Sequence, residues 1–257
     1  MEQIMTVKEI YERLSARIPE ELSEPWDNDG LMCATDDSRE VGRALVTLDV
    51  TEDIVDYAIA HKFDLIVSHH PLIFKPLGSL TEDSHVGRKL IKLIKHDVSV
   101  ISLHTRADKV DGGVNDLLCD ILKIKNATPF GEGGLGRVGE LDEELGMEDF
   151  SYLLKGLIDA DGVRVADACI PVQRVAVVGG DGKDFVRDAI RAGADTLVSG
   201  RLSYNIMTEA EEMGINLLEA GHFFTEQPVT YLFQQLLIRL DGEMYVEIRD
   251  SNKIKLI

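Results

Sequence analysis

Two adjacent histidines, His69 and His70, follow the short apolar stretch Asp64–Ser68 and precede Pro71. Neutral imidazole is the commonest metal ligand among protein side chains. Proline disfavours helix at the residue before it, so it restricts the chain as it leaves a predicted strand. The pair therefore predicts a metal site at a strand end, provided that other segments supply further ligands.

Two other segments pair a histidine with a carboxylate four residues later: His104 with Asp108, and His222 with Glu226. Residues four apart share one face of a helix, so each pair can meet if its segment is helical. Imidazoles and carboxylates together suit Zn, Fe, Mn or Co, and this many ligands can hold two divalent ions. We expect Asp108 or Glu226 to bridge them. The alternative, an ordinary hydrogen-bonding histidine, is expected at the helix-surface positions His61, His85 and His96.

The segments around these residues alternate between strand and helix patterns. Strands are expected near 44–48, 64–68 and 97–103, then in QRVAVVGGDG, ADTLVSG and INLLEAG, with EMYVEI as a final edge strand. Helices are expected at 5–22, where Thr6 and Glu9 form a capping box, at 52–61, 84–96 and 149–159, and between the later strands. This alternation predicts a mostly parallel α/β sheet. Residues 126–149 read as a linker or a β-hairpin, and their GEGGLG run lacks the Lys-Ser/Thr of a phosphate loop.

The two series of elements repeat at a fixed offset of 131 residues. Arg43–Val46 aligns with Arg174–Val177, and Asp64–Ser68 aligns with Asp195–Ser199, which puts Gly200-Arg201 at the place of the histidine pair. We therefore predict two similar, interlocked α/β repeats, 1–125 and 126–257, related by a pseudo-dyad. Ligands of α/β proteins bind beyond the carboxyl ends of strands, so the metal site is expected in the cleft between the repeats.

The composition restricts the partners. The 257 residues include 27 basic and 46 acidic side chains, a net charge of −19, which argues against nucleic acid. A small anionic or nucleotide ligand remains compatible because a metal supplies local positive charge, and Arg106 and Arg201 are candidates to hold a phosphate or to be solvated. No apolar run suits a membrane helix and the N-terminus does not read as a signal peptide, so we expect a cytoplasmic protein. Its three scattered cysteines are expected to be free, buried thiols.

Six segments together resemble one known family: WDNDGLM, LDVT at 48–51, SHHPLIF, HTRAD, VAVVGG and EAGHFFTE. The chain is similar throughout to the Nif-three-like proteins, the GTP cyclohydrolase I type 2 homologues, in the short form without an inserted middle domain. The resemblance implies a cytoplasmic two-repeat α/β protein with a dinuclear metal centre that assembles as a toroidal homohexamer. The implied ligands are His69, His70, Asp108, His222 and Glu226, with His104 beside the metals.

The activity implied by this resemblance is hydrolytic opening of the GTP imidazole ring at C8 by metal-activated water, with His104 moving a proton. The alternative is a non-enzymatic metal-binding or regulatory hexamer, or a metal chaperone. Three departures from the family pattern suggest altered substrate handling beside an intact metal site. Asp29 replaces a small apolar residue, Arg106 and Ala107 replace Asn and Leu, and a Gly-Asp…Tyr-His segment reads Gly200-Arg201…Tyr204-Asn205.

Overall fold

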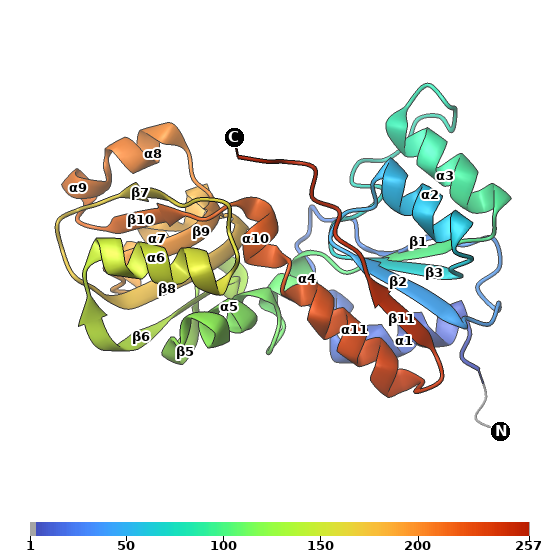
Figure 1. Cartoon of the computed structure of the whole chain (residues 1–257), viewed down its shortest axis with the longest axis horizontal. Coiled ribbons are helices and arrows are strands. Elements are labelled where there is room, and N and C mark those ends of the chain that lie inside the picture. The colour runs from blue at the N-terminus through green and yellow to red at the C-terminus, as the bar shows by residue number, and fades with distance from the viewer. Residues whose placement is uncertain (1–3, 257) are drawn as a thin grey trace. The chain divides into compact units, whose positions relative to one another are not determined.

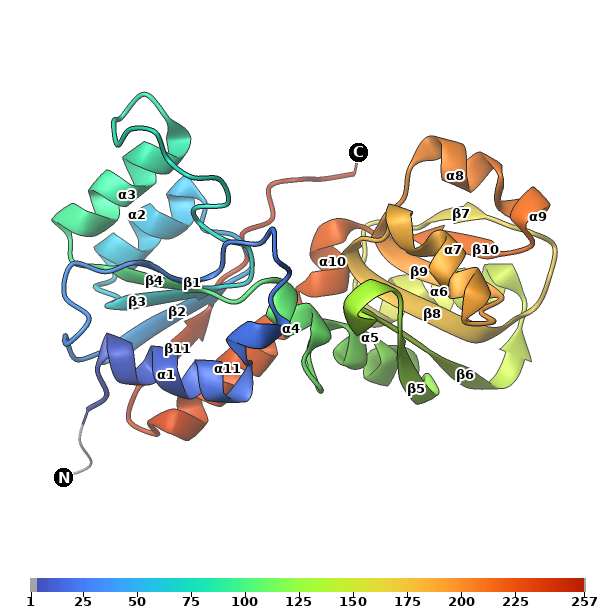
Figure 2. The same cartoon turned by 180° about the vertical axis from the view of Figure 1, so that it is seen from behind.

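The computed structural model describes residues 4–256 and divides the chain into two compact units (Figures 1 and 2). Unit 1 contains the chain up to Ala107 together with Val229–Lys253. Unit 2 contains Asp108–Pro228 and the last residues of the chain. Compactness does not define sequence repeats, so the division at residue 125 into repeats 1–125 and 126–257 stays a prediction. No helix within 4–256 is long and apolar enough to cross a membrane.

Unit 1 is built on a five-stranded sheet in the order β1-β4-β3-β2-β11. Neighbouring strands are parallel except β1, which pairs antiparallel with β4. The strands are β1 (Gly30–Cys33), β2 (Arg43–Thr47), β3 (Leu65–Ser68), β4 (Ser99–Ser102) and β11 (Tyr245–Ile248). The helices are α1 (Val7–Arg17), the 3₁₀ turn η1 (Glu20–Leu22), α2 (Glu52–Ala60), α3 (His85–Lys95), α11 (Val229–Leu240) and α4 (Thr105–Lys109), which continues into unit 2.

Helices cover both faces of this sheet. Successive strand residues point to opposite faces, and Leu45, Ile66 and Val100 form one apolar cluster with α2 and α3. On the other side α11 contacts β2, and α1 contacts α11 (Figure 2). The predicted capping box starts α1, since Glu9 N–H donates to Thr6 Oγ1 at 3.2 Å and Thr6 N–H donates to Glu9 Oε2 at 2.8 Å. Parallel β3 and β4 are thus buried on both faces, and their carboxyl ends lie side by side.

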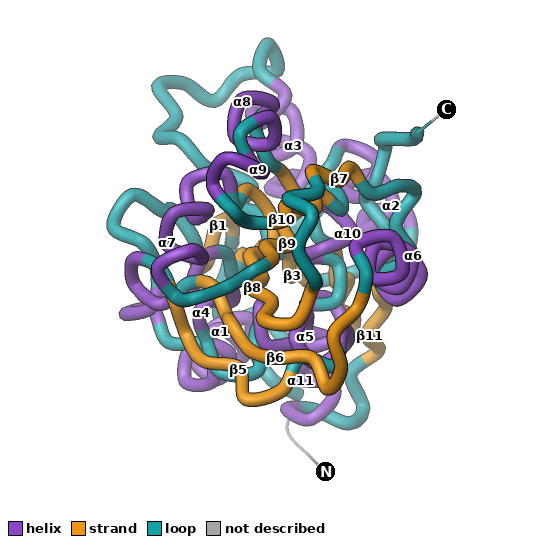
Figure 3. The backbone as a smooth tube through the Cα atoms, turned by 90° about the vertical axis from the view of Figure 1, so that its left-hand side faces the viewer, coloured by secondary structure: helices purple, strands orange, loops and turns teal. Residues whose placement is uncertain are grey.

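Unit 2 has a six-stranded sheet in the order β5-β6-β8-β9-β10-β7, seen in Figure 3. The central β8, β9 and β10 are parallel, and the outer strands are antiparallel to their neighbours. The strands are β5 (Lys125–Phe130), β6 (Gly136–Leu145), β7 (Arg164–Ala166), β8 (Val172–Asp181), β9 (Thr196–Arg201) and β10 (Asn216–Glu219). The helices are α5 (Val114–Leu122), η2 (Glu132–Gly134), α6 (Met147–Leu157), η3 (Lys183–Phe185), α7 (Val186–Arg191), α8 (Tyr204–Thr208), α9 (Ala210–Met213) and α10 (His222–Glu226).

Alternate residues of β8 divide the core of unit 2 into two layers. Val175 and Val177 join an apolar cluster with α5 and α6, whereas Ala176 and Val178 join one with α7, α8 and α9. The chain expected to be a linker or a hairpin is the β5–β6 hairpin, which confirms the second alternative. The short α10 follows β10 and contacts β8 and β9, which brings it to the carboxyl end of the parallel strands.

The two sheets share one strand register at the predicted offset. Val46 pairs with Val67 in unit 1, and Val177 pairs with Val198 in unit 2. The Asp64 carboxylate accepts the backbone N–H groups of residues 42 and 43, and the Asp195 carboxylate accepts those of residues 173 and 174. These aspartates close the amino ends of equivalent parallel strand pairs. The matching register and hydrogen bonds support the duplication inferred from the sequence.

Several local expectations are wrong in detail. Residues 30–33 form the edge strand β1, which is not among the expected strands, and its antiparallel pairing makes the sheet of unit 1 mixed. The antiparallel outer strands make the sheet of unit 2 mixed as well. The helix expected over residues 201–214 begins at Tyr204 and is broken at Glu209. The helix expected over 224–240 is interrupted at Pro228, which separates α10 from α11 because proline has no N–H to continue a helix. Cys169 is exposed, whereas Cys33 and Cys119 are buried as expected. The final strand β11 lies at a sheet edge, as predicted.

Candidate metal centre

Three histidines of unit 1 meet where β3 and β4 end. His69 and His70 follow β3 directly, and His104 lies two residues beyond β4. Each ring offers a nitrogen within 4.8 Å of the other two, and the ring centroids are 5.0 to 5.6 Å apart. His69 is buried, and the other two side chains are partly exposed. We call these residues the three-histidine cluster.

Each imidazole of this cluster is oriented through its Nδ1 atom. The Nδ1 of His69 lies 2.9 Å from the backbone oxygen of Leu103, and that of His70 lies 2.8 Å from Asp49 Oδ1. The Nδ1 of His104 lies 2.8 Å from Asp27 Oδ1. Carbonyl and carboxylate oxygens only accept hydrogen bonds, so each Nδ1 carries the proton and each Nε2 has the lone pair. Metal-binding histidines are held in this way by a carboxylate or a backbone carbonyl.

Both carboxylate oxygens of Asp27 accept hydrogen bonds from the residues that follow β4. Its Oδ2 accepts the N–H and the hydroxyl of Thr105, at 3.1 and 2.6 Å, while Oδ1 accepts His104. Burial alone would raise the pKa of this carboxyl, but the hydrogen bond and charge of His104 and the hydrogen bonds from Thr105 outweigh burial and hold the pKa well below its ordinary value. Asp27 is therefore a carboxylate that stabilises any positive charge on His104.

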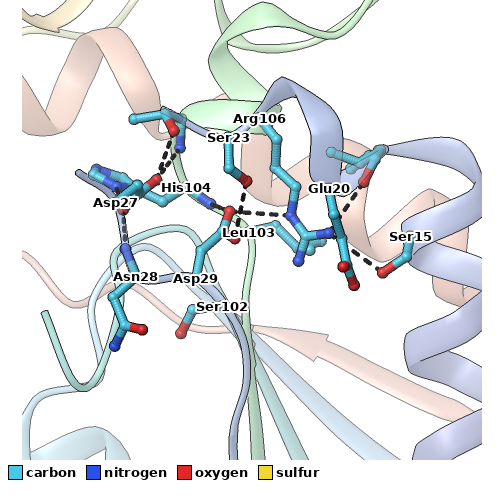
Figure 4. A network of polar contacts seen from close by, with 12 residues as sticks. Ser15, Glu20, Ser23, Asp27, Asn28, Asp29, Ser102, Leu103, His104 and Arg106 are labelled. Carbon is cyan, nitrogen blue, oxygen red and sulfur yellow. Dashed lines mark hydrogen bonds and ion pairs between the residues drawn. The ribbon is translucent and has the colours of Figure 1, made fainter. Parts of the chain in front are cut away.

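A buried ion pair lies beneath the same segment (Figure 4). Asp29 Oδ2 accepts Arg106 Nε at 3.0 Å and the backbone N–H of His104 at 3.1 Å. The Arg106 guanidinium also donates to Ser15 Oγ and to the Ile18 carbonyl at the end of α1, both at 3.3 Å. The Arg106 side chain has no exposed surface and that of Asp29 is 6% exposed. Asp29 and Arg106, which both depart from the family pattern, therefore form one interaction. Both alternatives for Arg106 are wrong, because its buried guanidinium is neither solvated nor available to a phosphate.

Unit 2 carries the remaining predicted ligands. The predicted helical pairing is confirmed in α10, where His222 Nε2 lies 3.0 Å from Glu226 Oε2. Asp108 and Glu226 are both buried, and each offers an oxygen within 4.8 Å of the other. Unit 2 therefore presents two carboxylates and an imidazole as a second group of donors, which we call the acidic ligand group.

Glycines allow α10 to lie against the sheet of unit 2. A Cβ at Gly180, where φ is +67°, would lie 2.2 Å from Glu226 Oε1 and 3.2 Å from His222 Nε2. A Cβ at Gly200 would lie 2.5 Å from Thr225 Oγ1 and 2.7 Å from the Cα of His222. No side chain fits at either position without displacing the ligand helix. Gly180 of the VAVVGG segment and Gly200, which aligns with His69 in the sequence repeat, therefore leave room for the helix that carries His222 and Glu226.

The donors suit a divalent transition metal. Imidazoles with a fixed Nε2 lone pair and buried carboxylates are the ligands that such ions take in proteins. Sequence reasoning named His69, His70, His104, Asp108, His222 and Glu226, and the structure gathers them into two groups, one in each unit. It did not assign a role to Asp27 or Asp49, whose only signal is their place in the WDND and LDVT segments. The exposed His61, His85 and His96 belong to neither group, as predicted.

Comparison with known proteins identifies the family. The model of the Duf34/NIF3 (NGG1p interacting factor 3) family matches residues 5–255, and the chain belongs to this family. A GTP cyclohydrolase 1 type 2 homolog of Clostridium perfringens is 36% identical over 248 residues, which cover 93% of this chain and 94% of the relative. The chain therefore matches a relative of similar length from end to end.

Solved structures show the same fold. A Bacillus cereus protein related to NIF3 has a TM-score of 0.87 at 23% identity and covers 100% of both chains. Reduced HcgD from Methanocaldococcus jannaschii has a TM-score of 0.85 at 26% identity, covering 95% of this chain and 97% of that protein. Both solved structures therefore share the fold of this chain over nearly its whole length.

Proposed function

We propose that this protein is a metal-dependent hydrolase with a dinuclear centre. The observation that carries the proposal is the three-histidine cluster. In it, carbonyl or carboxylate oxygens accept a hydrogen bond from each Nδ1 and leave each Nε2 as the atom that can bind a metal. Structural histidines rarely converge in this way, whereas metal sites require it. His69 and His70 are the proposed ligands of this cluster, with His104 beside them.

The acidic ligand group is proposed to complete the same centre. Three neutral imidazoles leave the four positive charges of two divalent ions uncompensated, and Asp108 and Glu226 supply negative charge and an oxygen able to bridge two ions. The chain supports the pairing, because Asp108 follows the last residue of unit 1 directly and both belong to α4.

The remaining residues would prepare the reaction. Bound divalent ions supply Lewis acidity and make a water molecule acidic enough to attack near neutral pH. Asp49 holds the Nδ1 proton of His70 and so keeps Nε2 available as a ligand. His104 is held in the same tautomer by the ionised Asp27, so its Nε2 can take a proton and the carboxylate stabilises the resulting imidazolium.

The proposed substrate is a purine nucleotide such as GTP, opened at C8 of its imidazole ring. The names of the curated relatives support this class. Arg106 takes no part in binding it, since its guanidinium is buried against Asp29. Arg201 is exposed at the end of β9 and remains a candidate for contact with the phosphates.

Elemental analysis of purified, metal-reloaded protein tests the centre. We expect two divalent ions per chain, and a lower content in His70→Ala and in Glu226→Gln because each variant loses a ligand. His96→Asn, which changes an exposed histidine outside both groups, is the matched control and should bind as the wild type does. One ion or fewer per chain after reloading would contradict the dinuclear proposal.

Turnover separates the enzyme from the alternative. Metal-loaded protein is incubated with GTP and with a panel of phosphoesters, and products are identified by mass spectrometry. Hydrolysis that is lost in Glu226→Gln and kept in His96→Asn supports the enzyme. Tight binding of metal without turnover of any substrate supports the metal-chaperone or regulatory function instead.

We also propose that the chain forms a homohexamer. The exposed side of α6 carries Tyr152, Leu153 and Leu157, an apolar surface suited to a second copy. Six chains of 28.5 kDa would have a mass of about 171 kDa. Light scattering after size exclusion measures this mass, and a monomer at micromolar concentration would contradict the assembly.

A further inference from the structure

Two aromatic side chains stand exposed beside the three-histidine cluster. Trp26 is 62% exposed and Phe74 is 46% exposed, and both belong to unit 1. Their ring centroids lie 6.2 Å apart, and each is within 6.3 Å of the His104 ring. Large aromatic residues at a protein surface expose much apolar area to water. A ligand that reaches the cluster would therefore meet these two rings.

The chain holds both rings in place through polar contacts. Trp26 precedes Asp27, whose carboxylate is bonded to His104 and Thr105, and the N–H of Glu24 donates to Thr105 Oγ1 at 2.9 Å. Asn28 donates to the carbonyl of Ile73, the residue before Phe74. The segment containing the tryptophan is thus anchored to the His104 segment and to the chain that follows His70. These contacts fix the backbone beside each ring, which lowers the cost of ordering the two segments when a ligand binds.

The two rings are oriented for a flat ligand. The planes of Trp26 and Phe74 make an angle of 73°, and each is also nearly perpendicular to His104. Perpendicular rings form a corner in which a planar molecule can stack on one face and meet the edge of the other ring. Such stacking accepts many ring systems, because it depends on the π-face and not on a particular hydrogen-bonding pattern.

We infer that Trp26 and Phe74 bind the heteroaromatic ring of the substrate and place it against His104. The inference rests on the proposed function, which supplies a purine nucleotide as the ligand. It adds that stacking on the base is what distinguishes a nucleotide from a bare polyphosphate.

The fluorescence of Trp26 provides a direct test, because it is the only tryptophan in the chain. Zinc-loaded wild-type protein is titrated with GTP, with guanosine and with inorganic tripolyphosphate. Guanosine and GTP are expected to quench the emission with saturation, and tripolyphosphate is not. Equal quenching by tripolyphosphate, or none by guanosine and GTP, would overturn the inference.

Calorimetry on two variants provides the control. Phe74→Leu should weaken guanosine and GTP binding by roughly 5- to 150-fold, the loss of one stacking partner. Tyr231→Leu changes an aromatic residue that is 57% exposed elsewhere in unit 1 and should leave binding unchanged. Unchanged binding in Phe74→Leu would overturn the inference. So would a lower assembly mass in Phe74→Leu, which would mean that a second copy of the chain covers the rings.

Failure of the proposed function would look different. Saturable quenching by guanosine without turnover would refute the hydrolase and leave the stacking site standing. Turnover of GTP with unchanged affinity in Phe74→Leu would keep the hydrolase and refute the stacking site. Metal content, measured on the same protein sample, is independent of both results.

Discussion

The buried ion pair between Asp29 and Arg106 allows a quantitative prediction. Asp29 and Arg106 must occur together, because either charge alone would be buried without its partner. Asp29→Ala leaves a guanidinium with no exposed surface and no carboxylate partner, beside neutral groups of Tyr11, Ser15 and Ile18. Removing one partner of a buried pair typically costs 3–5 kcal/mol, so we expect a loss of about 4 kcal/mol in the free energy of unfolding.

The double variant should recover much of this loss. Arg106→Met keeps the length of the side chain and removes the charge, and paired apolar replacements of buried ions are often neutral. Asp29→Ala with Arg106→Met should therefore cost about 2 kcal/mol less than the sum of the single variants. Part of the cost will remain, because the His104 N–H also loses its acceptor on Asp29.

Urea unfolding, followed by the fluorescence of Trp26, measures these energies for unit 1, where the tryptophan and the ion pair both lie. The pair of Lys92 with Asp56 is the control. Its atoms are 2.6 Å apart, but its side chains are 36% and 58% exposed. An exposed pair is worth 1 kcal/mol or less. A coupling energy for Asp29 and Arg106 no larger than that of this control would refute the reasoning.

Three further predictions concern unit 2 and the first helix. Only the exposed Cys169 should react with a thiol reagent at pH 8, because Cys33 and Cys119 are buried and burial raises the pKa of both thiols, that of Cys119 to about 12. The Cys119 thiol ionises at lower pH in the unfolded chain than in the folded one. Its contribution to stability is therefore present below about pH 9 and falls as the pH rises toward 12. Gly180→Ala should lower both the unfolding free energy and metal affinity more than Gly214→Ala, which has the same positive φ but an open space around its Cβ; equal losses would show that backbone strain alone matters. Thr6→Ala should cost about 0.5–2 kcal/mol in thermal or urea unfolding of unit 1, and no loss would mean that the capping box contributes nothing.

The sequence predicted what depends on local pattern and regular spacing. The central parallel strands, the capping box and the register offset all follow from periodicity within short windows or from self-similarity, whereas the segment after α5 was left open between a linker and a hairpin. The edge strand β1 was missed because its four residues lie in a stretch rich in turn formers and pair with β4 some 70 residues away. The alternation of strands and helices also gave no sign of the antiparallel outer strands.

The sequence pointed to the histidines and carboxylates that the structure clusters, but not to the aspartates that hold His104 and Arg106 in place. A histidine with a carboxylate four residues later is visible in one helical turn, which is why His222 and Glu226 were paired correctly. Asp27 and Asp29 reach His104 and Arg106 across 77 positions of the sequence. Such contacts exist only after the chain has folded, and nothing in the local pattern distinguishes these aspartates from ordinary turn residues.

In each repeat, an aspartate bonds the two parallel strands at the end opposite to the residues that could bind a ligand. Asp64 and Asp195 act at the amino ends of the strands, whereas His69-His70 and Gly200-Arg201 follow at the carboxyl ends. One copy can therefore exchange its ligands for other residues while the strand pair stays closed. In unit 2 this carboxyl end carries Gly200, whose lack of a side chain lets α10 pack against β9 while the hydrogen bonds of Asp195 at the other end of the strands are unaffected.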